Sequence, residues 1–291
     1  MSHYIKVILV LFVLSTTLFS NSFQDSTLVE GFAKAYAITA DNSGLETAQK
    51  NPAAITFTKQ QFSTTYTSYF DDAYKTVNIA YAKSIGNSFY LGFQIPTRLI
   101  SDIPETIADG NGEGFQIGTF SDTTVEGVLS VGVKSKNNKL RFGSNFKTRY
   151  QKLYSQTGTK IGLDLGAQYY SKHITLGASL QEIGSIMKWD TGKNENIPLI
   201  TNLGIAIRPN KIVTFLADTS LTKTTVDINT AISWKMHDQL TINGGIKELL
   251  KTQRLSVGLN LLLGGVYLDY AYSQNNYLGS IHKVGVRINV F

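Results

Sequence analysis

The feature that most constrains the fold is an alternation of apolar and polar residues that starts near residue 60 and returns about every ten residues. In one stretch Leu255, Val257 and Leu259 share one face of an extended strand, while Ser256 and Gly258 share the other. A transmembrane β-barrel needs this pattern, because one face of its wall meets lipid and the other encloses a lumen. The alternation therefore predicts an all-β chain with a lipid-facing surface.

The alternation divides the chain into segments with two kinds of connection. Every second connection is a tight turn, as at residues 86–87 and 209–210, and the intervening ones are usually longer, with 98–122 and 183–198 the longest. A soluble β-sandwich also has one apolar and one polar face. The short and long rhythm instead favours a barrel with brief periplasmic turns, extended extracellular loops and both chain ends in the periplasm. We predict an antiparallel up-and-down barrel of about fourteen strands, at residues 60–70, 74–84, 87–97, 123–134, 139–150, 159–169, 173–182, 199–208, 211–219, 225–235, 238–247, 253–262, 266–273 and 281–291.

The first residues have the form of a secretory signal peptide. Lys6 is followed by an apolar run over residues 7–19, and Ser20 and Ser22 supply small residues at the cleavage-site positions. We predict a signal peptide over residues 1–22. No later apolar run approaches the roughly 18 residues that a membrane-spanning helix requires, so a membrane-embedded mature chain has to be a closed barrel.

Residues 23–59 differ from the rest because they lack sustained alternation and precede the first strand. Two interpretations are open, a disordered periplasmic tail and a plug inside the barrel. Apolar and small residues such as Phe32, Ala33 and Ile38 favour the plug, since a solvated coil is poor in them. The predicted organisation is a signal peptide (1–22), an N-terminal luminal plug (23–59) and a transmembrane barrel (60–291).

Several basic residues fall on the predicted luminal face of neighbouring strands. This candidate luminal basic cluster consists of Lys134, Arg141, Lys147, Arg149 and Lys160. Such a cluster attracts a carboxylate head group or acidic residues of the plug. Ion pairs with Glu46, Asp41, Glu126 or Asp164 are enough to satisfy these charges, and we favour that structural interpretation.

Composition excludes several classes of function. The formal net charge is +6, but the 27 lysines and arginines form no basic run, so we expect no nucleic-acid partner. The chain has no cysteine, which rules out disulfides, thiolate metal sites and a lipoprotein anchor.

Residues suited to catalysis or metal binding show no recognisable arrangement. His173 and His237 lie at predicted tight turns, and His282 has no evident catalytic partner in the sequence. The acidic segment 109–113 resembles the start of a calcium loop, but Phe120 stands where a bidentate Glu is needed. We therefore expect no enzyme activity, no cofactor and no metal.

Four stretches occur in an order that resembles the FadL-type family of outer-membrane hydrophobic-compound transporters, especially its PorV/PorQ-like branch. The resemblance covers nearly the whole mature chain. It begins with a stretch rich in alanine (31–40) that leads into a plug motif of Asp41, Asn42, Asn51, Pro52 and Ala53. It continues with the loop 102–121, with 180–184 followed by 197–199, and with 268–273 followed by 278–279 and His282.

This resemblance implies a porin-like barrel in the bacterial outer membrane, surrounded by outer-membrane lipid. It implies passive uptake of small hydrophobic compounds, either fatty-acid-like or aromatic, as the function. The alternative is a non-transporting scaffold or secretion-associated barrel that binds secreted or periplasmic proteins through its loops. A shared fold does not distinguish the two.

Overall fold

The computed structural model describes residues 28–108, 114–250, 253–275 and 278–290. The predicted signal peptide, residues 23–27 of the predicted plug, the acidic segment 109–113 and Phe291 lie outside the described residues. Within the described residues, none of the helices has the length and apolar character needed to cross a membrane.

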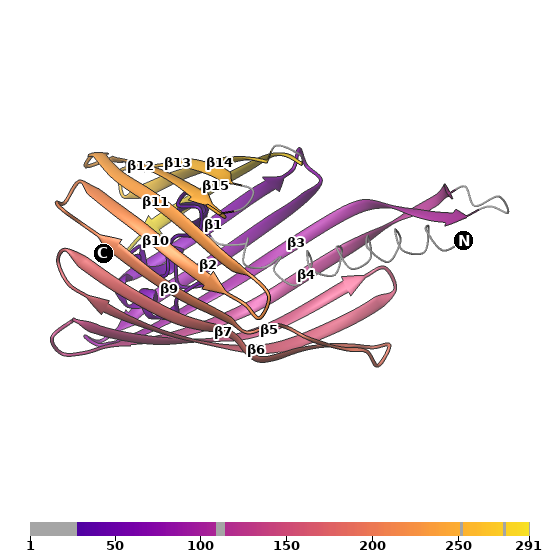
Figure 1. Ribbon diagram of the computed structural model, residues 1–291, viewed down its shortest axis with the longest axis horizontal. Helices are drawn as coiled ribbons and strands as arrows, with labels where there is room; N and C mark the ends of the chain where they lie inside the picture. Colours follow the sequence, from indigo (N-terminus) through magenta and orange to yellow (C-terminus); the bar gives the residue numbers. More distant parts are fainter. Residues whose placement is uncertain (1–27, 109–113, 251–252, 276–277, 291) are drawn as a thin grey trace.

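In the described residues, fifteen strands form one antiparallel sheet that closes on itself (Figure 1), because β1 pairs with both β2 and β15 and β6 also pairs with β7. Fourteen of them make the barrel, and the short β8 pairs only with β7. The predicted fold class is thereby confirmed. The strands are β1 (Gln60–Tyr69), β2 (Tyr74–Ile85), β3 (Phe89–Ala108), β4 (Gly114–Lys134), β5 (Leu140–Leu153), β6 (Gln156–Tyr170), β7 (Ile174–Trp189), β8 (Asn194–Asn196), β9 (Ile200–Ile207), β10 (Val213–Leu221), β11 (Val226–His237), β12 (Leu240–Lys247), β13 (Arg254–Leu263), β14 (Val266–Asn275) and β15 (Gly279–Asn289).

The two faces of the wall have the predicted polarity. In β13, Leu255 and Val257 are 64% and 50% exposed on the outside, whereas Ser256 between them is 8% exposed on the inside. Phe146 and Ile161 on β5 and β6 also point outward. Apolar side chains thus cover the outer surface and polar ones the inner surface, which is the reverse of a water-soluble protein and suits a wall surrounded by lipid.

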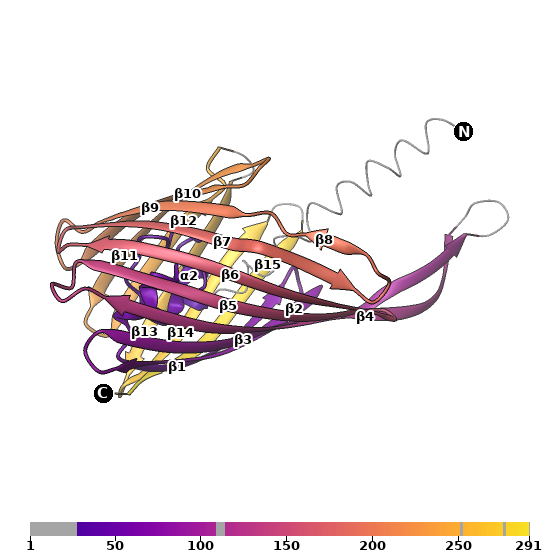
Figure 2. The same cartoon turned by 90° about the horizontal axis from the view of Figure 1, so that it is seen from below.

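The predicted loop 98–122 is wrong, because β3 and β4 continue through it as one long hairpin. The two strands pair from Phe89 and Val133 out to Ala108 and Gly114. Asp102 has a φ of 57°, and the register shifts beside it, so the alternation changes parity there and no longer reads as a continuous strand. Figures 1 and 2 show this hairpin extending well beyond the other strands. We call its outer part, residues 100–108 and 114–121, the β3–β4 arm.

The predicted loop 183–198 is also wrong. Strand β7 continues to Trp189, and residues 194–196 pair back onto it as β8. Glu182 and Gly184 both have positive φ values, of 62° and 63°, and the pairing with β6 is irregular at this point. The distortion shifts the apolar positions, which is why the alternation in the sequence ends near residue 182.

Residues 28–59, called the N-terminal segment below, lie inside the barrel (Figure 2). The segment contains α2 (Val29–Ala33) and two 3-10 helices, η2 (Gly44–Glu46) and η3 (Pro52–Phe57). Residues 28–41 are all buried although they include several polar side chains. Burial of this kind requires that the wall supply both room and hydrogen-bond partners.

The wall makes room for the N-terminal segment with inward-facing glycines. A Cβ added at Gly258 would lie 2.6 Å from the Cβ of Ala33, and one at Gly245 would lie 2.7 Å from the Cβ of Ala35. Such distances are below van der Waals contact, so only glycine allows the segment to lie so close to the wall. The glycines that meet the segment in this way, which we call the glycine seat, are Gly92, Gly132, Gly143, Gly166, Gly177, Gly204, Gly245, Gly258 and Gly285.

A valine in the glycine seat is expected to destabilise the docked segment. A Cβ at Gly166 would overlap the Asn51 side chain and lie 2.8 Å from Pro52 Cδ, so Gly166→Val should cost about 1–3 kcal/mol through overpacking. The outward-facing Gly127 is a matched control, because its nearest neighbour would be Thr148 Cγ2 at 3.4 Å. Protease cleavage within residues 28–59 should accelerate in Gly166→Val and stay unchanged in Gly127→Val. Equal cleavage of the two variants would contradict the close contact.

Candidate functional site

The Asn-Pro-Ala turn begins η3 and attaches it to β6. The Asn51 side-chain oxygen accepts a hydrogen bond from Ala53 N at 3.1 Å, and Pro52 occupies the first turn of the helix, where its missing N–H costs nothing. Asn51 Nδ2 donates to Thr39 O at 2.7 Å and to Ala167 O at 3.3 Å. One asparagine thus caps the helix, ties two parts of the segment together and binds the wall.

The other two residues of the plug motif stabilise the fold of the segment itself. The Asp41 carboxylate accepts from Lys34 Nζ at 2.7 Å and from Asn42 N at 2.8 Å. The Asp41 carbonyl accepts from Gln168 Nε2 on β6 at 3.0 Å. The motif therefore has two parts, with Asp41 and Asn42 folding the segment and Asn51 to Ala53 seating it on the wall.

Three of the five predicted basic residues come together in the lumen with three carboxylates. Lys147 Nζ lies 2.7 Å from Asp164 Oδ2, and Lys160 Nζ lies 2.7 Å from Glu182 Oε2. Three cations facing three carboxylates leave no net charge, so this group does not by itself attract an anionic head group. We call it the luminal charge cluster, and its members are Lys147, Arg149, Lys160, Glu126, Asp164 and Glu182.

Lys134 and Arg141 do not join the luminal charge cluster. The Arg141 guanidinium donates to Thr56 O and Thr56 Oγ1, both at 2.9 Å, and lies 3.8 Å from the centre of the Phe57 ring. Lys134 Nζ lies 5.5 Å from the centre of the Tyr90 ring. Arg141 therefore holds the end of the N-terminal segment against β5, a contact that the sequence did not predict.

A second group of charges binds the segment to the opposite side of the barrel. Arg287 on β15 lies 3.2 Å from Glu30 on α2 and 3.2 Å from Asp269 on β14. Glu30 also pairs with Lys34 within the segment. The sequence analysis did not identify Arg287 and Asp269 as site residues. Their positions in the alternation of their strands indicate that both face the lumen, and this could have identified them.

Asp218 on β10 provides a third attachment. Its Oδ2 accepts from Thr39 N at 2.8 Å and from Thr39 Oγ1 at 2.6 Å, and it lies 3.1 Å from Lys50 Nζ. Three donors from the segment thus converge on one buried wall carboxylate. Charge-assisted hydrogen bonds of this kind are the stronger ones in proteins.

Glu46 is the acidic residue of the N-terminal segment that has no ion-pair partner among the described residues, whereas Glu30 and Asp41 both have one. Its carboxyl accepts only long hydrogen bonds, from Glu30 N at 3.4 Å and Ser63 Oγ at 3.3 Å. Burial, together with the nearby carboxylates of Asp269 and Glu30, raises the pKa of Glu46 to about 7 despite the opposing effect of Arg287. Lys34 and Arg287 instead outweigh burial at Glu30 and lower its pKa to about 2.

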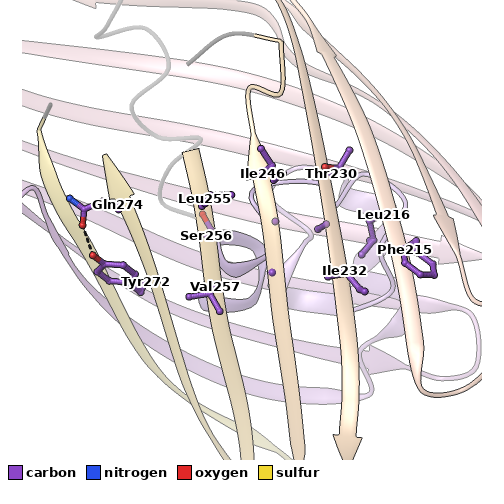
Figure 3. Close-up of a pocket in the computed structure, with 13 residues that line it drawn as sticks. Phe215, Leu216, Thr230, Ile232, Ile246, Leu255, Ser256, Val257, Tyr272 and Gln274 are labelled. Atoms are coloured by element: carbon purple, nitrogen blue, oxygen red, sulfur yellow. Dashed lines mark hydrogen bonds between the residues drawn. The ribbon is translucent and has the colours of Figure 1, made fainter. Parts of the chain in front are cut away.

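An apolar groove of about 810 Å³ lies on the outer wall over strands β10 to β14 (Figure 3). Its floor follows a row of cross-strand partners that runs Phe215, Ile232, Gly244, Val257 and Tyr272. Gly244 has no side chain, so the row is hollow at its middle. The next residue, Gly245, meets the N-terminal segment on the inner side. Only backbone separates the groove from the segment at this point.

Solved structures with a similar fold include a toluene transporter and a FadL homologue. The Pseudomonas putida toluene transporter TodX matches with a TM-score of 0.65 and 11% sequence identity, over 90% of this chain and 96% of that one. A Pseudomonas aeruginosa FadL homologue matches with a TM-score of 0.62 and 11% identity, over 90% and 98%. Comparison with protein-family models and with curated protein sequences gives no match. The chain therefore has the FadL-type barrel fold.

Docking of the N-terminal segment should weaken as the pH rises through the raised pKa of Glu46. The folded state binds this proton more tightly than an unfolded chain, whose Glu has a pKa near 4.5. The stabilisation is therefore fully present below pH 4.5 and is lost as the pH rises to about 7. Protease cleavage within residues 28–59, measured from pH 4.5 to 8 with rates corrected for the protease, should accelerate over this range.

Glu46→Gln should remove this pH dependence, because the amide is neutral at every pH. The matched control is Glu195→Gln, which changes an exposed pair with Lys193 far from the segment. A pH profile that is the same in Glu46→Gln and in the unmodified chain would show that Glu46 is not the titrating group.

Proposed function

We propose that this chain is a FadL-type barrel of the bacterial outer membrane that takes up small hydrophobic compounds passively. The fold likeness to TodX and to a FadL homologue supports this proposal, as does the apolar outer surface. The predicted signal peptide agrees with export to that membrane. No covalent bond is made or broken, so the chemistry consists of partitioning into and out of the barrel.

One observation carries the proposal: a separate segment fills the part of the bore that the luminal charge cluster of the wall does not fill. Wall side chains cannot leave a barrel, whereas a segment attached through hydrogen bonds and ion pairs can move. Asp218, Arg287 and Asn51 make the attachments, and each involves exchangeable polar contacts. In this proposal the N-terminal segment is a gate, and uptake requires that it shift.

The distribution of charge suggests which side of the bore a hydrophobic compound follows. The luminal charge cluster lies on β4 to β7, where an apolar molecule would have to displace buried ion pairs. On the other side, Ala37 and Ala40 of the segment pack against Ala206, Leu216 and Ala231 of β9 to β11. This apolar contact is the favourable path, and it is close to the groove on the outer wall.

The second candidate function is a non-transporting scaffold of the PorV/PorQ-like kind. The specific observation in its favour is the extent of bonding inside the bore, since a barrel that only presents its loops to a partner needs no passage. The two candidates differ in one measurable property, which is whether the unmodified chain increases the entry of hydrophobic compounds into liposomes.

Locking the N-terminal segment to the wall should block uptake. The chain has no cysteine, so Thr39→Cys combined with Asp218→Cys gives a single possible disulfide at a contact where the side chains already touch. Uptake of radiolabelled toluene and of a long-chain fatty acid into proteoliposomes should fall at least about tenfold on oxidation and recover on reduction, if closure of the bore is the rate-limiting barrier.

The reduced form of the same variant is the control, because it has the same sequence and the same lost hydrogen bonds. Equal uptake by the oxidised and reduced forms would contradict gating by the segment. Uptake by the unmodified chain that does not exceed empty liposomes would contradict the transport function and favour the scaffold.

A further inference from the structure

The hairpin formed by β3 and β4 is longer than a membrane span requires. Strands β3 and β4 have 20 and 21 residues, whereas a membrane-spanning strand needs about 9–11. The arm therefore continues beyond the bilayer by about ten residues, or roughly 30 Å at 3.3 Å per residue. Figure 1 shows it projecting from the end of the barrel opposite the C-terminus.

Each strand of the arm has a free edge. Pairing of β3 with β2 ends at Leu99, and pairing of β4 with β5 ends at Asp122. Beyond these residues neither strand pairs with a third strand in the part of the chain that the structure describes. At the base of the arm, Tyr154 N donates to Ser121 O and the Tyr154 ring packs against Phe120, so the free part of the β4 edge lies beyond Phe120. An isolated two-stranded ribbon is at best marginally stable in water, and its unpaired N–H and C=O groups are a template for a further strand.

One face of the arm is apolar and exposed. Ile103 pairs with Phe120 and Ile107 pairs with Phe115, so these four side chains share a face. Ile107 is 46% exposed and Phe115 49% exposed, and Ile117 beside them is 52% exposed. Apolar side chains gathered on a segment that stands in water indicate an interaction surface.

The two free edges are not equivalent. The β3 edge carries a bulge at Asp102, then Pro104 and Glu105, and each of these features obstructs pairing with another strand. Over residues 115–121 the β4 edge has neither proline nor charge. The β4 edge also has a bulge, at Ile117, which exposes a further apolar side chain. The edges differ in Pro104 and Glu105, which only β3 carries, so the β4 edge is the less obstructed one for an added strand.

We propose that the β4 edge of the arm binds an extended segment of a partner protein, which adds to the sheet as a third strand. The partner segment has alternating apolar side chains, to cover Phe115 and Ile117, and a net positive charge. The charge follows from the arm, whose described residues include Asp102 and Glu105 and no lysine or arginine. This inference goes beyond uptake and does not depend on a gated bore.

A second copy of this chain does not fit the same edge. Two barrels inserted in the same direction have arms that point the same way, so a two-fold axis along the membrane normal would place their β4 strands parallel. A symmetric closed dimer through strand edges needs antiparallel strands. The arm also extends away from the bilayer, so lipid does not cover it.

The test uses defined peptides and the full-length chain in detergent. The probe is a fluorescent eight-residue peptide of alternating valine and lysine, compared with one of alternating valine and glutamate, and binding is read by fluorescence anisotropy. Ile117→Lys should weaken binding of the lysine peptide at least about tenfold, because a lysine on the open edge blocks strand addition. Ile107→Lys, with the same substitution at similar exposure on the obstructed strand, should change it less than about threefold.

Several outcomes would overturn the proposal. Equal losses in the two variants would indicate binding to the face and not to the edge, and stronger binding of the glutamate peptide would contradict the charge argument. A dimer of the unmodified chain in sedimentation that Ile117→Lys dissociates would assign the edge to a second copy. Uptake should be unchanged in Ile117→Lys. Because the peptide measurement needs no transport, failure of the proposed function leaves it intact.

Discussion

The structure depends on close contact between the N-terminal segment and an inner wall that lacks side chains where the segment lies. A barrel of this size cannot fill its lumen with wall side chains alone where nine inward positions are glycine. The segment fills that space and satisfies the polar groups that the wall turns inward. Without the segment, the same glycines would leave a wide bore. Whether the bore is open or closed therefore depends on where residues 28–59 lie.

Polar contacts, more than apolar ones, decide where the segment lies. Asn51 on β6, Asp218 on β10 and Arg287 on β15 attach it at three places around the wall. Removing one partner of a buried ion pair leaves an uncompensated charge, at a cost of about 3–5 kcal/mol, whereas exchanging both partners is far less disruptive. Such contacts specify one docked position strongly and are still reversible, which the proposed gate requires. The luminal charge cluster uses the same chemistry to close the other half of the bore.

The fold was largely predictable from sequence, because period-two alternation is a direct consequence of a wall with two different surroundings. The prediction from sequence was wrong where the backbone departs from regular pleating. Asp102 begins the arm with a bulge, and Glu182 and Gly184 distort β7, so the sequence pattern predicts loops in both regions where the structure has strands. Propensity for strand persists there, but a change of parity removes the pattern on which the prediction relied.

The site was less predictable, since its contacts join residues far apart in the chain. The sequence identified Lys147, Arg149 and Lys160 as luminal by parity, but not Glu182, which lies at the distorted part of β7. Arg287 and Asp269 face inward on the last strands, and only the closed barrel brings them to Glu30, 257 residues away from Arg287. Parity reports which face a residue is on and carries no information about its partner across a lumen.

The structure docks the N-terminal segment inside the barrel, and the other properties of the barrel follow from that position. Hydrogen exchange of the full-length chain in lipid nanodiscs, followed by mass spectrometry of peptides from residues 28–59, tests it most directly. The structure predicts that the hydrogen-bonded amides of this segment exchange many times more slowly than those of an unstructured peptide, because they are buried inside the barrel. Exchange at the rate of an unstructured peptide, with the strands still protected, would contradict the docked segment and the account built on it.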